Sequence, residues 1–356
     1  MSDVRPSSGG SRSSEVALPS LSIVIPVYND PKWIEATVAD AVEAVRRSSF
    51  AEPEIVIVDD GSDAETQQVL ARLQVPFPLR IIRQENQGRI GARRTGLRAA
   101  RGTLALLLDA RVSLQPDGLQ FVAIAVELDR SLTVWNGHCE TVLDGNPYAR
   151  FWNVLTELAY RDYLSNPRTM SYDAEQFDRY PKGAGCFLAP REALLESIDN
   201  FDSRYTDPRN ANDDTSVIRV LAERHSINIS PGFACTYRSR DALMPFLRHA
   251  HHRGIVFVDG WARTGGRFFG AILAFYPLSA LAVAVGLKRP KVGLCALALA
   301  PVGGVGVGIA WRRSGADCLA LGSLGVPWLC FYGAGMWRGL WLTAQGRASR
   351  SKPVVE

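Results

Sequence analysis

Three long apolar runs near the C-terminus constrain what this chain can fold into more than any other feature. They lie at 268–287, 292–311 and 318–337, each is 20 residues long, and none contains a charged residue. About 20 apolar residues suffice to span the hydrocarbon core of a bilayer. Buried helices of a soluble domain normally keep a polar stripe, which these runs lack. The pattern predicts a transmembrane region of about three helices over 268–344.

The orientation of these runs is not fixed by charge. Basic residues flank every run, among them Arg263, Arg267, Lys288, Arg289, Lys291, Arg312, Arg313, Arg347, Arg350 and Lys352. The positive-inside bias therefore selects no side. No apolar signal segment follows Met1, so we expect a multi-pass protein of the cell membrane with a cytoplasmic N-terminal domain. Three crossings would put the C-terminus on the far side, whereas an interfacial or re-entrant segment would change that count.

Composition excludes several classes of protein. The net charge is +4 without a clustered basic face, which argues against a nucleic-acid partner. Six scattered cysteines with no CxxC pair indicate reduced, buried thiols rather than disulfides or a zinc site. The Ser/Gly-rich residues 1–19 are expected to be a disordered tail. The predicted organisation continues with a domain over 20–240, an interfacial basic segment over 241–267 and a tail over 345–356.

Strand and helix patterns alternate between residues 21 and 109. Apolar β-branched runs predict strands at 21–27, 54–62, 79–84 and 103–109, with helical segments between them. Such alternation predicts a doubly wound, mainly parallel α/β sheet. Ligands bind such sheets outside the carboxyl ends of the strands. Polar residues fall at three of these ends, at 28–29, 59–60 and 109–111, which indicates a binding site there.

Several motifs, taken in order, resemble one known family. They are SIVIPVYN, IVIVDDGS, N-x-G-x-x-x-ARR-x-G at 86–96, LLLDA, KGAGCFLAPREAL, FDSRY and NDDTSVIRVL. As an ordered set over residues 20–260, they resemble family 2 glycosyltransferases of the GT-A fold, of the membrane-anchored bacterial type. The resemblance implies a Rossmann-like sheet and an inverting sugar transfer from a nucleotide-sugar donor.

The resemblance also implies roles for individual residues. Donor-nucleotide contacts are expected from Pro26, Tyr28, Asp60, Arg93 and Asp109, while Arg94 stands where the family usually has Asn. Asp59 is interpreted as a turn residue at the end of its strand. Asp214 matches the catalytic base, although an acid at a helix N-terminus is also favoured by the helix dipole alone. Asp213, Gly183 and Gly185 are expected on the acceptor side.

The segment Asp109–Ala110–Arg111 departs from the family pattern. The family places a second Asp, a metal ligand, where this chain has Arg111, and a guanidinium donates hydrogen bonds but cannot ligate a metal. Three interpretations stay open. A divalent metal (Mg²⁺ or Mn²⁺) binds through Asp109 with the donor phosphates. Alternatively, Arg111 binds the diphosphate directly. Finally, the protein binds a nucleotide without transferring its sugar.

A basic segment precedes the first apolar run. In LMPFLRHAHHRG, at 243–254, a helix would place Leu243 and Leu247 on one face, with Arg248 and Arg253 near the site. By analogy with the family, these arginines would form a lid over the donor diphosphate. An interfacial helix whose cations meet anionic lipid is an equal alternative. The HAHH run as a zinc site is disfavoured, because no partner ligand has suitable spacing.

The acceptor is the least defined part of the sequence. The aromatic stretch 146–180 is expected to cover the acceptor side. Apolar runs beside the site favour a membrane-associated acceptor, either lipid-linked or a cell-envelope glycan. The rival hypothesis is a catalytically inactive membrane protein that binds nucleotide sugars as a sensor or scaffold. Donor turnover by the purified protein separates the two.

Overall fold

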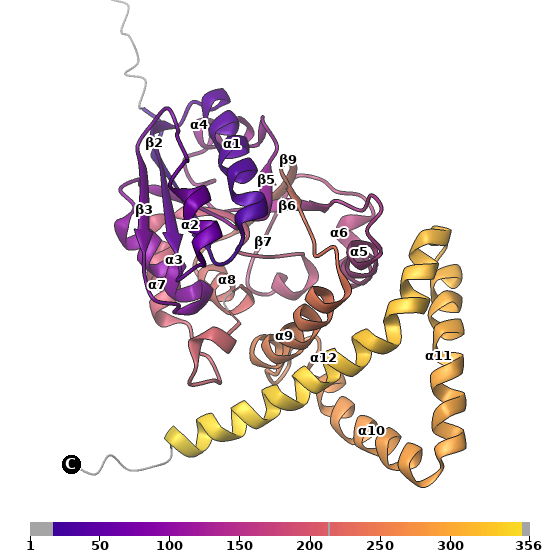
Figure 1. Cartoon of the computed structure of the whole chain (residues 1–356). Helices are drawn as coiled ribbons and strands as arrows, with labels where there is room; N and C mark the ends of the chain where they lie inside the picture. The colour runs from indigo at the N-terminus through magenta and orange to yellow at the C-terminus, as the bar shows by residue number, and fades with distance from the viewer. Residues whose placement is uncertain (1–16, 213, 351–356) are drawn as a thin grey trace, which may run out of the picture.

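A computed structural model describes residues 17–212 and 214–350, and Figure 1 shows the arrangement. The first half of the domain contains β1 (Ser20–Val27), α1 (Pro31–Arg47), β2 (Ala51–Asp59), α2 (Ala64–Leu70), β3 (Leu79–Arg83), α3 (Gly88–Ala99) and β4 (Leu104–Leu108). The second half contains β5 (Val112–Leu114), α4 (Gly118–Leu128), β6 (Trp135–Thr141), α5 (Pro147–Ala159), α6 (Arg161–Leu164), β7 (Met170–Tyr172), η1 (Phe177–Arg179), β8 (Cys186–Pro190), α7 (Arg191–Asn200), η2 (Pro208–Asn210), α8 (Thr215–Ala222) and β9 (Ile227–Tyr237). The C-terminal helices are α9 (Leu243–Trp261), α10 (Phe269–Lys288), α11 (Pro290–Ala310) and α12 (Gly315–Arg350).

One mixed sheet organises the domain. Its strand order is β3-β2-β1-β4-β8-β6-β9-β5, with β7 beside β9. The four strands β3, β2, β1 and β4 are mutually parallel, whereas β8 runs antiparallel to β4. The predicted α/β class is therefore confirmed, followed by apolar helices. Because β1, β2 and β4 are parallel, their carboxyl ends meet at one edge of the sheet.

Both faces of the sheet are covered, which explains the continuous apolar runs of its central strands. One core cluster joins β1, β2 and β4 to α1 and α4, and the other joins the opposite face to α3, α7 and α8. Close contact on this second face depends on Gly96 of α3, where an added Cβ would lie 2.3 Å from Val24 Cγ1. Such an approach would force α3 away from the sheet.

The basic segment after the sheet is helical. It forms α9, which extends from Leu243 to Trp261. Leu243 and Leu247 are four residues apart in this helix and therefore share one face, as predicted. Leu247 is buried with Phe246 and Ala250, whereas Leu243 is 44% exposed. Leu243 is the first residue of the helix and lies beyond its packed part. Much of α9 packs against α12 and is not free at an interface.

The three apolar helices are present, each long and apolar enough to cross a membrane. Two of them, α10 and α11, match the predicted lengths of about 20 residues. The third, α12, has 36 residues and extends well beyond the C-terminal end of the apolar run at 318–337. In Figure 1, α12 runs along the domain, and α10 and α11 lie on its other side.

Candidate active site

A cavity of about 300 Å³ opens at the carboxyl ends of β1, β2 and β4. Six of the residues singled out in the sequence line it, namely Pro26, Tyr28, Asp60, Asp109, Arg111 and Arg253. We call this space the donor cavity. Its remaining polar wall comes from Asp30 before α1, Arg89 of α3, Tyr237 at the end of β9, Arg240 after it, and His249 and His252 of α9. The sheet topology thus brings together strand ends that are distant in the sequence.

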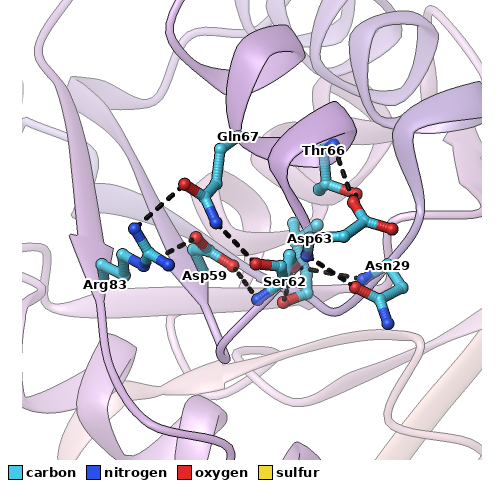
Figure 2. Close-up of polar contacts among 8 residues, drawn as sticks. Asn29, Asp59, Ser62, Asp63, Thr66, Gln67 and Arg83 are labelled. Atoms are coloured by element: carbon cyan, nitrogen blue, oxygen red, sulfur yellow. Dashed lines mark hydrogen bonds and ion pairs between the residues drawn. The ribbon is translucent and has the colours of Figure 1, made fainter.

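The two carboxylates after β2 have different surroundings. Asp59 Oδ1 accepts a hydrogen bond from Ser62 N at 2.8 Å, and its Oδ2 lies 3.8 Å from Arg83 Nε (Figure 2). Asp59 therefore closes the turn, as interpreted from the sequence. The neighbouring turn residue Gly61 has φ +81°, a conformation that favours glycine.

Asp60 lies on the cavity side and holds the next loop in place. Its Oδ1 accepts hydrogen bonds from Gln84 Nε2 at 2.7 Å and Gln87 N at 2.9 Å. Its Oδ2 accepts one from Gly88 N at 2.9 Å, at the start of α3. The carboxylate thus orders the start of α3, while Oδ2, with a single donor, retains acceptor capacity for a ligand.

Arg93 lies at the floor of the site, between two carboxylates. Its side chain is only 1% exposed, with Nη2 2.8 Å from Asp109 Oδ1 and Nη1 3.2 Å from Asp214 Oδ1. Asp109 is at the end of β4, and Asp214 immediately precedes α8. A contact of Arg93 with a base or a phosphate stays a prediction. The Arg93 guanidinium fixes the separation of the two acids, and we call these three residues the Asp–Arg–Asp bridge.

The loop before β8 supports this bridge. Ala184 N donates to Asp214 Oδ1 at 3.3 Å, and Asp109 N donates to Gly185 O at 2.9 Å. A Cβ at Gly185 would lie 3.1 Å from Asp109 Oδ2, so glycine leaves room for the carboxylate. Gly183 N donates to Asn136 Oδ1 at 3.2 Å. The predicted acceptor-side residue Asp213 lies outside the described residues.

The charge state of Asp214 reflects opposing influences. Burial raises the pKa of Asp214. The positive charges of Arg93, Arg89 and Arg253 and the Ala184 N–H lower it by more than burial raises it, so that the pKa is about 2. Asp214 is therefore ionised at neutral pH and able to accept a proton. Because cations hold its pKa low, any anion that draws those cations away will make Asp214 more basic.

Arg111 lines the donor cavity but is anchored by a residue that sequence reasoning missed. Its Nε lies 2.5 Å from Oδ2 of Asp30, the residue before α1. Burial raises the pKa of Asp30, and the Arg111 cation opposes that shift. The two Nη groups of Arg111 remain available for an anion, with the planar geometry suited to phosphate. The only signal in the sequence was the position of Asp30 at a strand end.

These residues do not fit the divalent metal that the family resemblance implies. One oxygen of Asp109 already binds Arg93, and Arg111 replaces the second carboxylate. Asp30, a third carboxylate of the cavity, is bound to Arg111. Hard divalent cations require several oxygen ligands. In this site the carboxylates of Asp109 and Asp30 are instead paired with the guanidinium groups of Arg93 and Arg111. The donor set therefore favours an anion held by arginines.

The two arginines expected to form a lid both belong to α9 but lie on different sides of it. Arg253 lines the donor cavity, but Arg248 is exposed and points elsewhere, so the structure does not place Arg248 at the site. Burial lowers the pKa of His249 well below its ordinary value and that of His252 to about 4. Both imidazoles are therefore neutral at pH 7. Arg89 and Arg240 also line the donor cavity but were not predicted from the sequence. Arg89 belongs to the basic motif of α3, and Arg240 ends the basic stretch RSR after β9.

A second, smaller cavity of about 60 Å³ adjoins the first and contains Asp214. Arg89 and Arg253 line both spaces, and we call the second one the acceptor pocket. Its walls include Tyr160, from the aromatic stretch predicted to cover this side, and Trp261. The pocket thus has a charged floor and an aromatic wall.

Lys182 is a further residue of the acceptor pocket that the sequence did not reveal. Its Nζ lies 4.2 Å from the ring centre of Phe177, 5.2 Å from Trp261 and 5.3 Å from Tyr160. Burial lowers the pKa of Lys182 to about 7, although the Asp178 charge opposes the shift. Its protonation therefore changes close to neutral pH beside Asp214.

Residues 22–179 match the model of the family described as Glycosyl transferase family 2. An uncharacterized glycosyltransferase, alr2836 of Nostoc sp., is 33% identical over 128 residues, which is 35% of this chain and 38% of that protein. The putative teichuronic acid biosynthesis glycosyltransferase TuaG of Bacillus subtilis is 28% identical, over 44% of this chain and 64% of its own length. The dolichyl-phosphate beta-glucosyltransferase of Saccharomyces cerevisiae is 40% identical, over 25% of this chain and 29% of its own length. The chain thus spans less than two thirds of each of these relatives.

Two solved structures resemble the chain over most of its length. The mannosyltransferase PcManGT of Pyrobaculum calidifontis, in complex with GDP-Man and Mn²⁺, has 17% identity and a TM-score of 0.48, covering 95% of this chain and 89% of that one. TarS 1–349 of S. aureus in complex with UDP has 15% identity and a TM-score of 0.49, covering 93% and 92%. The family match ends at residue 179, so the part of the chain that carries Asp214 lies beyond it.

Proposed function

Because residues 22–179 match the model of Glycosyl transferase family 2, we propose that this chain transfers a sugar from a nucleotide-sugar donor to a membrane-associated acceptor with inversion. The observation that carries the proposal is the position of Asp214. Its carboxylate lines the acceptor pocket, which shares Arg89 and Arg253 with the donor cavity, and it is held there by Arg93. A base between two binding spaces is what an inverting transfer requires.

In the proposed reaction, an acceptor hydroxyl in the acceptor pocket attacks the anomeric carbon of the donor sugar. The bond from that carbon to the diphosphate oxygen breaks, and the nucleoside diphosphate leaves with the bonding electrons. Asp214 accepts the hydroxyl proton. When the diphosphate attracts Arg89 and Arg253, the cations that lower the pKa of Asp214 are partly neutralised, so donor binding strengthens the base.

The leaving diphosphate is stabilised in this proposal by protein cations. Arg89, Arg111, Arg240 and Arg253 line the donor cavity from four different segments of the chain. Arginine binds phosphate through paired N–H donors, and fixed donors around a developing charge lower the barrier. Metal-independent transfer follows, because Asp109 is already engaged by Arg93.

The acceptor is proposed to be lipid-linked or a growing cell-envelope glycan at the membrane surface. Phe257 and Trp261 line the acceptor pocket, and both rings contact Phe268 beside α10, at 5.6 Å and 4.9 Å between centroids. The pocket is thus continuous with the root of an apolar helix. Since nucleotide sugars are cytosolic metabolites, the catalytic domain is placed on the cytoplasmic side of the cell membrane.

Turnover of a panel of nucleotide sugars by the purified chain, reconstituted with native membrane lipids, tests this function. We expect release of nucleoside diphosphate that depends on added membrane lipid, together with sugar incorporation into the lipid fraction. Nucleotide binding without turnover across the panel would overturn the enzymatic proposal and leave a sensor or scaffold.

Arg111→Gln is expected to weaken binding of a nucleoside diphosphate about 10- to 100-fold, because a charge-assisted contact contributes about 1.5–3 kcal/mol. Binding of the matching monophosphate is expected to change much less. Isothermal titration with UDP and UMP, or with the pair selected by the donor panel, measures the difference.

The matched control is Arg83→Gln, which removes an arginine that is 62% exposed and pairs with the turn residue Asp59. That variant should bind both nucleotides like the wild type. Equal losses for the diphosphate and the monophosphate in Arg111→Gln would remove Arg111 from the phosphate site.

A further inference from the structure

Helix α12 contacts the catalytic domain from one end to the other. Near its start, Asp317 forms an ion pair with Arg150 of α5 at 3.2 Å. In its middle, the Trp328 ring lies 5.5 Å from that of Phe151. Near its end, an added Cβ at Gly346 would lie 2.5 Å from Arg204 O. The two outer contacts are 29 residues apart, or about 44 Å along a helix.

The contacting residues form one continuous face of α12. They recur at helical spacing and are Asp317, Leu321, Leu324, Trp328, Tyr332, Gly335, Gly339 and Gly346. The opposite face is apolar and exposed, with Leu319, Leu329, Trp337, Leu340 and Trp341 between 39% and 69% exposed. A helix that rests on a domain through one face and presents Leu and Trp on the other is suited to a membrane surface.

Packing against α9 indicates the depth of α12 relative to the bilayer. Helix α9 packs along α12, with glycines at the contact: a Cβ on Gly254 would lie 2.1 Å from Tyr332 O, and one on Gly335 would lie 2.0 Å from His251 O. The same helix α9 supplies His252 and Arg253 to the donor cavity. A helix that lines a nucleotide site lies outside the hydrocarbon, and the centre of α12 lies beside it.

We propose that α12 lies in the plane of the membrane surface beneath the catalytic domain, and that only α10 and α11 cross the bilayer. A helix with contacts to one extramembrane domain at both ends cannot also span the membrane. Figure 1 shows α12 between the domain and the α10–α11 pair. The C-terminus then lies on the same side as the catalytic domain.

The turn between α10 and α11 supports two full crossings. Lys288, Arg289 and Lys291 lie at this turn, and charges are costly at the centre of a bilayer. The two helices have 20 and 21 residues, about 30 Å each, which matches the hydrocarbon thickness. The three cations therefore reach the headgroups of the opposite leaflet.

This arrangement places the acceptor pocket at the membrane surface. Trp261 of the pocket and Phe268 at the root of α10 are in contact, so the pocket opens beside the point where the chain enters the bilayer. An acceptor carried by a lipid would thus be taken from the leaflet on which the domain rests.

Single-cysteine accessibility in intact and permeabilised spheroplasts tests this topology. The background replaces the exposed Cys139, Cys295 and Cys330 by Ser and keeps the three buried cysteines. Reporter positions are Asp144→Cys in the domain, Arg289→Cys at the turn and Glu356→Cys at the C-terminus. Full-length protein with donor turnover serves as the check on folding.

With an impermeant maleimide, Arg289→Cys is expected to be labelled in intact cells. Asp144→Cys and Glu356→Cys should both require permeabilisation. Labelling of Glu356→Cys on the side opposite Asp144→Cys would show that α12 crosses, and would overturn the proposal. An Arg289→Cys that is labelled only after permeabilisation would equally overturn the two crossings.

Discussion

Asp214→Asn is expected to lower sugar transfer by a factor of about 10²–10⁴, the usual contribution of a general base. The amide keeps the shape of the side chain but cannot accept the acceptor proton at neutral pH. Nucleotide affinity should stay within a few-fold of wild type, because Asp214 lines the acceptor pocket rather than the donor cavity. Initial rates and a nucleotide titration on the same preparation measure both quantities.

Asp162→Asn is the matched control, since it makes the same chemical change at an exposed position of α6. It should leave both transfer and binding unchanged. If Asp214→Asn retains near wild-type turnover, Asp214 is not the base. If it loses nucleotide affinity in parallel with rate, its role is to maintain the pocket through Arg93.

Arg93→Met is expected to destabilise the domain by roughly 3–5 kcal/mol, the loss seen when one partner of a buried ion network is removed. Arg93 is 1% exposed and contacts both Asp109 and Asp214, so its loss leaves two acids facing one another. The acids should respond by protonating, which would also lower transfer. Denaturant unfolding followed by tryptophan fluorescence gives the stability change.

Arg94→Met provides a control one residue along the same helix. Arg94 is 36% exposed and pairs with Asp199 at the surface, so its loss should cost about 1 kcal/mol or less. Comparable destabilisation by the two variants would contradict the central position of Arg93. A stable Arg93→Met variant with normal transfer would show that the Asp–Arg–Asp bridge is not needed for function.

The sheet was predictable because burial on both faces leaves a strong local signal. β1 is mostly apolar and β4 entirely so, and each ends directly before polar residues. Parallel topology then gathers those ends at one edge. Tyr28, Asp60, Asp109 and Arg111 could therefore be assigned to one cavity before any coordinates were known.

The contacts within the site were not predictable, because they depend on partners distant in sequence. Arg93 appeared to be a ligand contact, yet its partners are 16 and 121 residues away along the chain. Asp30 belongs to no motif, and Lys182 belongs to one that assigns it no role. Their contacts appear only when α1 and the loop before β8 pack at the sheet edge. Ion pairing across a fold leaves no periodicity in the sequence.

The course of α12 was hidden for a related reason. Hydropathy over 318–337 indicates a helix that tolerates lipid, and it cannot distinguish lipid from a protein surface on one face. The glycines at 335, 339 and 346 permit close packing against α9 and the loop before η2. They also resemble the small residues of packed membrane helices, so composition alone favoured a third crossing.

The central claim is that arginines, not a metal, neutralise the leaving diphosphate in this site. Transfer from the donor identified in the panel, measured in excess EDTA and again after addition of Mg²⁺ or Mn²⁺, tests it most directly. If arginines neutralise the diphosphate, the rate in EDTA should be within about twofold of the rate with metal. Abolition of transfer by EDTA with full recovery on Mn²⁺ would contradict it, and would show that Asp109 leaves Arg93 to bind a cation.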